Sequence, residues 1–486
     1  MPTASARATE FESHYPEFLK GMPIYMIIEK YINSLKGKHI TFIGAGISNK
    51  PLIELMLSNN IDVTVCDKQT FEELGETALH YKNLGAKLIL GDNYLKNIDS
   101  DIIFRTPGIM PWKEEIQSAV RNGAVLTSEM EVFFELCPCK IIGITGSDGK
   151  TTTTSLIGEL LRNSNKTVHV GGNIGNPLLT KVDKINFKNI AVLELSSFQL
   201  ISMRSSPHIS VVTNLSPNHL DVHNDMAEYV DAKRNIVKYQ TSSDTAVLNY
   251  DYAHTRAYAD STNAKVIFFS RKEKLKDGVY LDNDTIVFSS DNYISKILPI
   301  SKIVLPGLHN VENYMAAIAA LYGMIDVKSI KKTAREFCGV KHRIEFIKEI
   351  NGAKYYNDSI ATTPSRSMAA LKAFGKKVIL IAGGRGKDLP YDEFAESAIK
   401  YCKAILLIGE EADSISNAVK SNPGFNSSID IQKHATLENA IDAAYKMAST
   451  DDVVLFSPAC ASFDMFKNFE DRGDKFREIV EKLVLC

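Results

Sequence analysis

The chain has 486 residues, which is enough for about three domains of ~150 residues each. A hydrophobic content of 44% and a charged content of 23% are typical of globular proteins with an ample core. The formal net charge of −2 excludes a global field that would attract nucleic acid, so local groups must hold any anionic ligand.

The cysteines and the N-terminal residues indicate the cellular compartment of the protein. The seven cysteines are too scattered to predict a disulfide framework, and the closest pair, Cys137 and Cys139, has neither a redox nor a zinc-site spacing. Residues 1–20 lack the apolar core of a signal peptide, and the apolar stretch at 22–32 is too short to span a bilayer. We therefore expect a soluble, cytoplasmic protein with reduced thiols, whose first ~20 residues are a disordered extension.

Residues 39–67 predict a strand, a helix and a second strand. A glycine-rich turn at 44–46 and the acidic Asp67 about 20 positions later resemble a dinucleotide-binding fingerprint. However, Asn49 occupies the third glycine position, where close packing of helix on strand normally excludes a side chain. We therefore expect a Rossmann-like fold that binds a nucleotide-bearing ligand other than NAD. A later strand delivers residues 105–108 to the edge where such ligands bind.

The stretch 143–152, Gly-Ile-Thr-Gly-Ser-Asp-Gly-Lys-Thr-Thr, follows an apolar strand and precedes a helix. Glycines turn backbone N–H groups inward, and a helix N-terminus is partially positive, so such a loop cradles phosphates. Lys150 would reach the outer phosphates, and the hydroxyl of Thr151 would bind Mg²⁺. The spacing is a variant, because Ile144 occupies the usual first glycine position. The alternative, an ordinary turn before a helix, is disfavoured by the strand–loop–helix context.

Further strand ends deliver polar groups to the same sheet edge. Strand 190–194 ends in Glu194, where an NTPase needs a carboxylate for Mg²⁺. A strand at 209–213 is followed by Asn-His-Leu-Asp, which contains His219; a solvated loop histidine is the alternative interpretation. Lys233 lies in a predicted helix, and periodicity alone makes it a surface lysine.

An alanine-rich helix after residue 308 carries Asn310 and Asn313 one turn apart, where they either cap the helix or present amides to a base. From about residue 340, strands and helices alternate as in a second doubly wound sheet. Two of its strand ends run into polar loops that contain Lys387 and Ser462. We therefore expect a second substrate site there.

Motifs along the chain resemble those of the Mur ligases, three-domain ATP-dependent enzymes that form amide bonds in peptidoglycan synthesis. The shared features are Thr-Gly-Ser-Asp-Gly-Lys-Thr-Thr, the strand-end Glu194, Asn-His-Leu-Asp and Leu-Pro-Gly-x-His-Asn-x-x-Asn. Gly-Gly-Asn-Ile-Gly, Glu-Leu-Ser-Ser-Phe-Gln-Leu and the C-terminal Ser-Pro-Ala-Cys-Ala-Ser run resemble the branch that adds D-glutamate. The resemblance covers nearly everything from about residue 38 to the C-terminus.

The resemblance implies an α/β fold with three domains. These are a Rossmann-like UDP-binding domain at 1–128, a P-loop ATPase-like mononucleotide-binding domain at 129–339 and a Rossmann-like amino-acid-binding domain at 340–486. It implies that ATP converts the carboxylate of UDP-N-acetylmuramoyl-L-alanine into an acyl phosphate, which D-glutamate attacks through a tetrahedral intermediate. We expect a cytoplasmic monomer with these small-molecule substrates and with no nucleic-acid or membrane partner.

The resemblance also implies the roles of single residues. ATP is bound by Gly146, Ser147, Asp148, Gly149, Lys150, Thr151, Thr152, Asn310, Asn313, Arg343 and Asp358. Two Mg²⁺ sites are implied, formed by Thr151, Glu194, His219 and a carbamylated Lys233. The catalytic set is Lys150, Glu194, His219 and Lys233. The UDP-linked substrate is bound by Ile47, Ser48, Asp67, Lys68, Gly108, Asn173, Ser196 and Gln199. D-Glutamate is bound by Thr362, Lys387, Ser462 and the backbone of Phe469.

The sequence departs from the family pattern at several positions. Ile360 stands where several members carry a lysine near the phosphates, and Arg385, where others carry aspartate, is a candidate substitute. Asn218 replaces a common aspartate.

The alternatives to this function are a related ligase for another amino acid or for folylpolyglutamate, a nucleotide-binding switch and an NAD dehydrogenase. The Ser462 motif disfavours the first, the lack of Asn-Lys-x-Asp disfavours a GTPase, and Asn49 disfavours the dehydrogenase.

Overall fold

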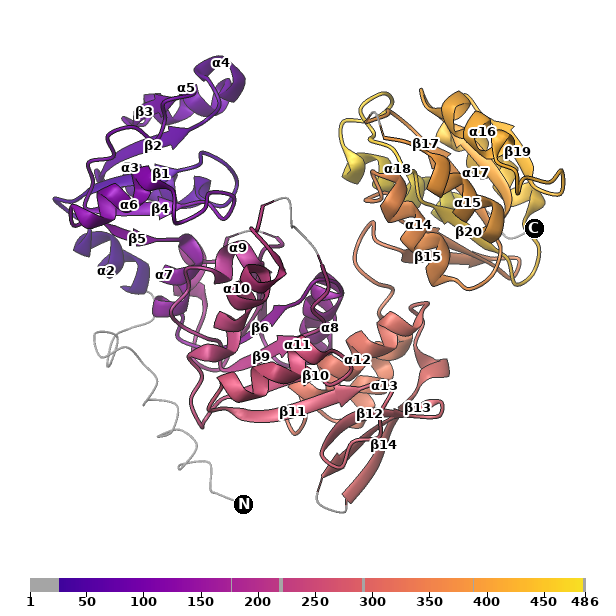
Figure 1. Ribbon diagram of the computed structural model, residues 1–486, viewed down its shortest axis with the longest axis horizontal. Coiled ribbons are helices and arrows are strands. Elements are labelled where there is room, and N and C mark those ends of the chain that lie inside the picture. Colours follow the sequence, from indigo (N-terminus) through magenta and orange to yellow (C-terminus); the bar gives the residue numbers. More distant parts are fainter. Residues whose placement is uncertain (1–25, 176, 218–221, 291–292, 388, 484–486) are drawn as a thin grey trace. The chain divides into compact units, whose positions relative to one another are not determined.

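The computed structural model describes residues 26–175, 177–217, 222–290, 293–387 and 389–483 (Figure 1). Its strands form three sheets with helices between them, which confirms the α/β fold class. The chain divides into two compact units: residues up to 297 with 313–329, and residues 298–312 with those from 330 onward. The domain boundaries at 128 and 339 remain a prediction. Among the residues described, every helix is too short or too polar to cross a bilayer.

The first sheet is parallel, with strand order β3-β2-β1-β4-β5. The chain order reverses between β1 and β4, and ligands of such sheets bind at the carboxyl ends of these two strands. The predicted strands of this region are confirmed. The strands are β1 (His39–Ile43), β2 (Asp62–Asp67), β3 (Lys87–Leu90), β4 (Ile102–Arg105) and β5 (Val125–Thr127). The helices are α2 (Ile27–Ser34), α3 (Lys50–Ser58), α4 (Phe71–Leu74), α5 (Glu76–Asn83), α6 (Glu114–Arg121) and α7 (Glu129–Leu136).

The second sheet has nine strands in the order β14-β13-β12-β11-β10-β9-β6-β8-β7. Strand β6 lies between β9 and β8 and runs parallel to both, so the carboxyl ends of the three strands meet at one edge. The strands are β6 (Lys140–Thr145), β7 (Val168–Gly172), β8 (Ile190–Glu194), β9 (Ile209–Val212), β10 (Thr245–Asn249), β11 (Lys265–Ser270), β12 (Gly278–Asp282), β13 (Thr285–Ser290) and β14 (Tyr293–Pro299). The α-helices are α8 (Lys150–Asn163), α9 (Ser197–Leu200), α10 (Met226–Lys238), α11 (Ala253–Arg256), α12 (Leu308–Ala320) and α13 (Val327–Glu336). The 3₁₀ helices are η3 (Leu179–Lys184), η4 (Ala257–Ser261) and η5 (Ile300–Lys302).

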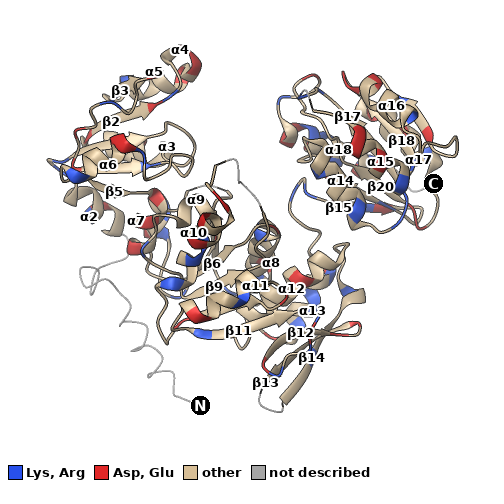
Figure 2. Ribbon diagram, viewed as in Figure 1, with Lys and Arg blue, Asp and Glu red and all other residues tan. Residues whose placement is uncertain are grey.

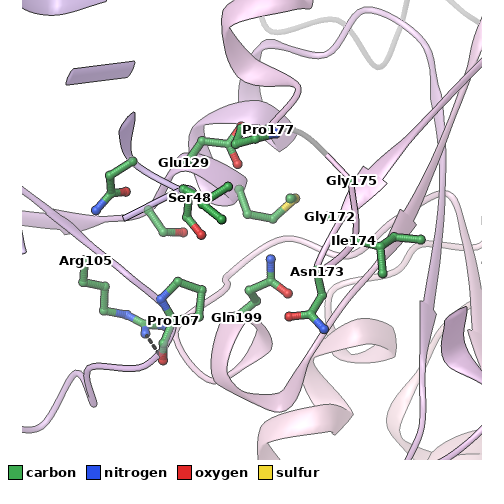
Figure 3. Close-up of a pocket in the computed structure, with 14 residues that line it drawn as sticks. Ser48, Arg105, Pro107, Glu129, Gly172, Asn173, Ile174, Gly175, Pro177 and Gln199 are labelled. Carbon is green, nitrogen blue, oxygen red and sulfur yellow. Dashed lines mark hydrogen bonds between the residues drawn. The ribbon is translucent and has the colours of Figure 1, made fainter. Parts of the chain in front are cut away.

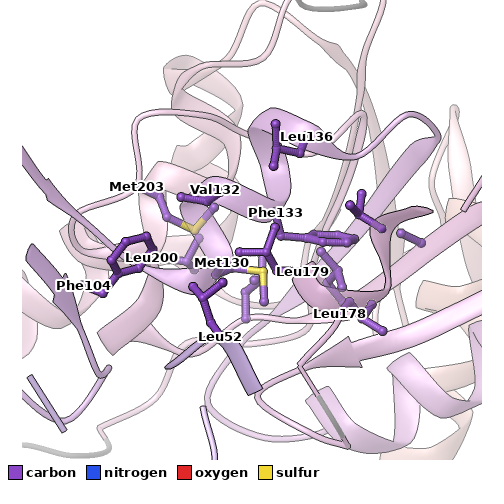
Figure 4. Packing of buried hydrophobic residues seen from close by; sticks show 14 of the residues in the cluster. Leu52, Phe104, Met130, Val132, Phe133, Leu136, Leu178, Leu179, Leu200 and Met203 are labelled. Carbon is purple, nitrogen blue, oxygen red and sulfur yellow. The ribbon is translucent and has the colours of Figure 1, made fainter. Parts of the chain in front are cut away.

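Helix α7 joins the first two sheets through a shared apolar core. Its buried side chains pack with residues of α3 and β4 from the first sheet and of η3 and α9 from the second (Figure 4). The labelled members of this cluster are Leu52, Phe104, Met130, Val132, Phe133, Leu136, Leu178, Leu179, Leu200 and Met203. Because protein interiors are close-packed, this core fixes how the loops of the two sheets meet.

The third sheet has the order β15-β16-β20-β17-β18-β19 and is parallel except for the β15–β16 pair. Its strands are β15 (Glu345–Ile350), β16 (Ala353–Asn357), β17 (Val378–Gly383), β18 (Cys402–Ile408), β19 (Asp430–Lys433) and β20 (Val453–Phe456). Its helices are α14 (Pro364–Ala373), α15 (Asp392–Tyr401), α16 (Ala412–Ser421), α17 (Leu437–Met447) and α18 (Phe469–Lys482). The second doubly wound sheet predicted from residue 340 onward is therefore confirmed.

Acidic and basic residues are interspersed along the described chain (Figure 2). This mixture agrees with the small net charge of −2. Specific binding of an anion must then depend on the local arrangement of a few cations and N–H groups. The six cysteines within the described ranges are free thiols.

Gly383 should tolerate alanine much less than Gly375. Gly383 has a φ of 114°, and a Cβ there would lie 1.9 Å from the carbonyl oxygen of Ile408 on β18. Gly375 has a φ of 63°, with open space around it. Gly383→Ala should lower the free energy of unfolding by about 2 kcal/mol more than Gly375→Ala, because only the first adds a backbone clash to the left-handed strain. Urea unfolding followed by circular dichroism measures both variants, and equal losses would contradict the packing argument.

Candidate active site

The loop between β6 and α8 has the backbone shape of a phosphate cradle. Gly146 and Gly149 have φ angles of 149° and 79°. A Cβ at Gly146 would lie 1.9 Å from Thr213 Oγ1, and a Cβ at Gly149 would lie 2.4 Å from Asn313 Oδ1. Both positions therefore require glycine for conformation and for space. The predicted strand–loop–helix motif is confirmed, including its variant spacing.

Lys150 begins α8 and lies against the concave side of this loop. Its ammonium donates to the carbonyl oxygens of Gly146 at 2.9 Å and Ser147 at 2.8 Å. The first N–H groups of α8 have no partner within the helix and point toward the same region. Thr151 and Thr152 follow in the first helical turn, both half-buried. A cation, helical N–H groups and hydroxyls are thus brought together, and this is a donor set that suits phosphate oxygens.

Glu194 ends β8, directly beside the loop after β6. Its side chain is 2% exposed, and its Oε1 accepts a hydrogen bond from Asn173 Nδ2 at 2.9 Å. In the part of the chain that the structure describes, its Oε2 is buried without a hydrogen-bond partner. A buried carboxylate oxygen needs a counter-charge, and a hard cation such as Mg²⁺ fits this need.

A complete metal site would need further ligands besides Glu194. Within the described ranges, no three His, Cys, Asp or Glu residues cluster as a metal site. His219, the predicted ligand on the neighbouring strand end, lies outside the described residues, as does Asn218. The geometry of Glu194 therefore fits a metal, and the remaining ligands stay a prediction.

Lys233 is buried on α10, so the surface position expected from periodicity alone is wrong. The side chain is 2% exposed, its Nζ donates to Thr145 Oγ1 at 3.1 Å, and Nζ lies 4.9 Å from the ring centre of Tyr229. Burial, and next the positive charge of Lys150, holds the pKa of Lys233 well below its usual range. Periodicity failed here because α10 buries a wide face that includes this one long polar side chain.

A pocket of about 280 Å³ lies where the first sheet meets the second (Figure 3). It is lined from the carboxyl ends of β1 and β4, from the start of α7 and from the loop after β7. Four predicted substrate-binding residues meet here: Ile47, Ser48, Asn173 and Gln199. The predicted Lys68 and Gly108 are exposed and lie outside this lining.

Ser196 and Gln199 hold each other in place at the start of α9. Ser196 Oγ accepts from the backbone N–H of Gln199 at 3.2 Å, and Gln199 Oε1 accepts from the backbone N–H of Ser196 at 2.9 Å. This reciprocal capping box fixes the glutamine that lines the pocket. Ser196 thus acts on the pocket through Gln199.

Two side chains close the turn after β1. Asn49 is 1% exposed, and its Nδ2 donates to the carbonyl oxygen of Gly44 at 2.9 Å. Asp67 accepts from the backbone N–H groups of Ala45 at 2.8 Å and Gln69 at 3.0 Å. The asparagine therefore fills the space that a third glycine leaves open in a dinucleotide fingerprint, and Asp67 stabilises the turn itself.

The pocket contains two buried charged side chains, Arg105 and Glu129. Sequence reasoning placed residues 105–108 at the ligand-binding edge without a role for Arg105, and it missed Glu129. The guanidinium of Arg105 donates to the carbonyl oxygen of Phe198 at 2.8 Å and to Ser202 Oγ at 2.7 Å. Glu129 accepts from the backbone N–H of Leu179 at 2.9 Å, and burial raises its pKa to about 7. The position of Arg105 at a strand end was the only signal for it, and Glu129 had none.

The two asparagines of α12 make different contacts. Asn313 Oδ1 accepts from Thr153 Oγ1 at 3.1 Å and lies against Gly149 of the phosphate loop. Asn310 Nδ2 donates to the carbonyl oxygen of Pro306 at 2.7 Å, which secures the turn before the helix. Asn310 thus stabilises the helix start, while Asn313 is positioned beside the glycine loop that follows β6.

Three loops of the other unit meet at the carboxyl edge of β16, β20 and β17, which are neighbours in the sheet. Lys387 Nζ donates to Thr362 Oγ1 at 3.2 Å, so two of the predicted D-glutamate residues are in contact. Ser462 follows β20 and is 2% exposed. The carbonyl oxygen of Phe469 accepts from Ser359 Oγ at 2.8 Å, which joins the start of α18 to the loop of Thr362.

Asp358 is buried at the start of the same loop. It accepts from Ser457 Oγ at 2.7 Å and from the backbone N–H of Ile344 at 3.2 Å. Burial raises the pKa of Asp358 to about 7, although its hydrogen bonds and the nearby Arg343 and Arg366 lower it. A carboxyl poised near neutrality at a strand end is typical of a functional site.

Comparison with known proteins identifies the family. The description "Mur ligase middle domain" matches residues 144–321, and "Mur ligase, glutamate ligase domain" matches residues 342–460. A curated protein of Acetivibrio thermocellus, named UDP-N-acetylmuramoylalanine–D-glutamate ligase, is 47% identical over 94% of this chain and 99% of its own length. A protein of the same name from Clostridium kluyveri is 45% identical over 92% of this chain and 98% of its own length.

Solved structures share the fold at lower identity. The UDP-N-acetylmuramate–alanine ligase of Thermotoga maritima is 19% identical, with a TM-score of 0.55 over 91% of this chain and 99% of its own. A UDP-N-acetylmuramoyl-L-alanyl-D-glutamate–2,6-diaminopimelate ligase is 20% identical, with a TM-score of 0.57 over 80% of this chain and 93% of its own. These likenesses show the shared fold. The two domain matches and the curated relatives show that the chain belongs to the Mur ligase family.

Proposed function

We propose that this chain is an ATP-dependent ligase that joins D-glutamate to UDP-N-acetylmuramoyl-L-alanine in cytoplasmic peptidoglycan-precursor synthesis. The observation that carries the proposal is the close arrangement of a phosphate cradle, the unpartnered oxygen of Glu194 and the buried amine of Lys233. The curated relatives, 43–47% identical, support the choice of D-glutamate through the name they share. We further propose a monomer with domains at 1–128, 129–339 and 340–486.

When bound, ATP supplies the phosphoryl group that activates the substrate carboxylate as an acyl phosphate, and Mg²⁺ neutralises charge on the phosphates. The loop N–H groups and Lys150 hold and neutralise the phosphates. Thr151, Glu194, His219 and Lys233 would hold the metal ions. Asn310, Asn313, Arg343 and Asp358 would bind the remainder of the nucleotide. The residues thus act by positioning and by charge compensation, which suits phosphoryl transfer.

Lys233 is a proposed metal ligand only after reaction with CO₂. Its lowered pKa favours the neutral amine, whose lone pair forms an N–C bond with CO₂ while a proton leaves to solvent. The product is an anionic carbamate. This change places a negative charge near the positive charge of Lys150 and provides an oxygen ligand for a hard metal ion.

The two carboxylate-bearing substrates are assigned to separate residue sets. The pocket between the first two sheets would hold part of the UDP-linked substrate, through Ile47, Ser48, Asn173 and Gln199. The rest of this substrate would be bound outside the pocket lining, by Asp67, Lys68, Gly108 and Ser196. D-Glutamate would be held by Thr362, Lys387, Ser462 and the backbone of Phe469. A cation with hydroxyl and N–H donors is the chemistry that carboxylates require.

The proposed reaction is tested by phosphate release from ATP. Purified protein with Mg²⁺ and UDP-N-acetylmuramoyl-L-alanine should release phosphate with D-glutamate and not with L-glutamate, L-lysine or meso-diaminopimelate. Release with a different amino acid would overturn the assigned acceptor while leaving the ligase chemistry intact. Absence of release with all four would reject the ligase proposal.

Lys150→Ala should reduce ligation by at least about 10³-fold, because the phosphate charge would be left uncompensated in a partly enclosed site. The control is Lys166→Ala, which removes an exposed lysine just beyond the end of α8 and should leave turnover unchanged. Phosphate release under saturating substrates measures both variants. Near-normal turnover by Lys150→Ala would reject the role of the loop.

Lys233→Ala should also lose activity, and millimolar formate or acetate should restore part of it by replacing the carbamate oxygens. Lys238→Ala, an exposed change on the same helix, is the matched control and should need no rescue. Mass spectrometry of the intact wild-type protein near pH 8 should reveal a CO₂ adduct that the variant lacks. Failure of rescue together with an absent adduct would exclude the carbamate.

A further inference from the structure

We propose that Arg366, rather than Arg385, supplies a second cation to the D-glutamate site and determines selectivity for a dicarboxylate amino acid. This inference rests on the proposed function, and it adds to that function a residue that none of the motifs marks. Arg366 lies in the first turn of α14 and is exposed. Its guanidinium is therefore accessible to a small ligand.

One of the two carboxylates of D-glutamate lacks a cationic partner among the residues assigned to the site. D-Glutamate brings two carboxylates to the site, whereas the residues assigned to it include one cation, Lys387. A carboxylate drawn out of water without a charged partner is costly, and an arginine fork matches carboxylate geometry.

Arg366 and Lys387 converge on one short segment, residues 360–362. Arg366 Nη1 donates to the carbonyl oxygen of Ile360 at 3.2 Å, and the backbone N–H of Thr362 donates to the same oxygen at 2.8 Å. Lys387 Nζ donates to the side chain of Thr362 at 3.2 Å. The guanidinium of Arg366 and the ammonium of Lys387 therefore contact residues two positions apart on the same segment.

The buried side chain of Arg472 holds the residue that precedes segment 360–362 in place. Arg472 is 1% exposed and donates to Ser359 Oγ at 3.0 Å and to the carbonyl oxygen of Ser359 at 2.9 Å. The same guanidinium donates to the carbonyl oxygens of Cys460 at 3.1 Å and Ala461 at 2.9 Å. Because Ser462 follows directly, Arg472 ties the loop of Thr362 to the loop of Ser462. The two exposed cations thus act at a rigid, pre-organised site.

The charges of Arg366 and Arg385 have different surroundings. Arg385 Nε lies 3.9 Å from a carboxylate oxygen of Glu410, and its main chain exchanges hydrogen bonds with Ala461. Within the described ranges, Arg366 and Lys387 form no ion pair with a carboxylate. Arg366 is near enough to Asp358 to lower the pKa of that carboxyl, but burial has the larger effect and raises this pKa to about 7, so Asp358 compensates the charge of Arg366 incompletely. The charge of Arg385 is partly compensated by Glu410. The charges of Arg366 and Lys387 therefore remain available to an incoming dicarboxylate.

The test is steady-state phosphate release by the full chain with D-glutamate as the varied substrate. Arg366→Met should raise KM for D-glutamate by about tenfold or more, while KM for ATP and for the UDP-linked substrate changes less than about twofold. Arg366→Lys should recover most of the affinity. Lys372→Met, which removes an exposed charge from the same helix, should match the wild type. The ratio of kcat/KM for D-glutamate to kcat/KM for D-glutamine should fall about tenfold in Arg366→Met.

Three results would overturn the inference. An increase in KM in Arg385→Met with none in Arg366→Met would assign the second cation to Arg385. A fall in kcat at unchanged KM for D-glutamate would place Arg366 on the phosphoryl group instead. If the wild type is active and KM for D-glutamate is unchanged in every variant, the proposal that a second cation binds D-glutamate is rejected. A wild type that is inactive with D-glutamate differs from all three results. It would reject the proposed function, and this inference would be rejected with it.

Discussion

The site depends on the close approach of the loop backbone at 146–149 to the ends of neighbouring strands and helices. A methyl group on Gly146 would lie 1.9 Å from Thr213, and one on Gly149 would lie 2.4 Å from Asn313. The backbone amides can surround a phosphate group only because no side chain intervenes. Glu194 and Thr145 are then held within the same small region by the parallel strands β8 and β6. The position of Lys233 follows, since its amine bonds to Thr145.

Parallel strand order places the proposed ATP-binding and D-glutamate-binding regions at the carboxyl edges of the second and third sheets. In the second sheet β9, β6 and β8 are adjacent, and in the third sheet β16, β20 and β17 are adjacent. These strands come from distant parts of the sequence, but their following loops meet because the strands run the same way. The chemistry is therefore carried by loops, and the buried strands provide the rigid support.

Features encoded in a local pattern could be predicted from the sequence. The glycine loop between a strand and a helix, the strand that ends in Glu194 and the second doubly wound sheet each have such a pattern, and each of these structural elements was confirmed. The burial of Lys233 could not be predicted from its helix, because it depends on what packs against that helix. Glu129 was missed for the same reason, since its backbone partner lies 50 positions away along the chain. Arg105 was placed at the ligand-binding edge, but its contacts with Phe198 and Ser202, which lie 93 and 97 positions away, could not be predicted. The contact of Arg366 with Ile360 spans one loop and joins two residues with no periodic relation.

The order in which the chain is synthesised bears on when the nucleotide-binding loop can be completed. Residues 313–329 belong to the same compact unit as residues 26–297, although the intervening residues 298–312 belong to the other unit. Asn313, which packs against Gly149 and bonds to Thr153, leaves the ribosome about 160 residues after the loop that it supports. A nascent chain that ends before residue 313 contains every residue of the glycine loop but lacks Asn313, which packs against that loop. The packing around the glycine loop is therefore completed only after α12 has been synthesised.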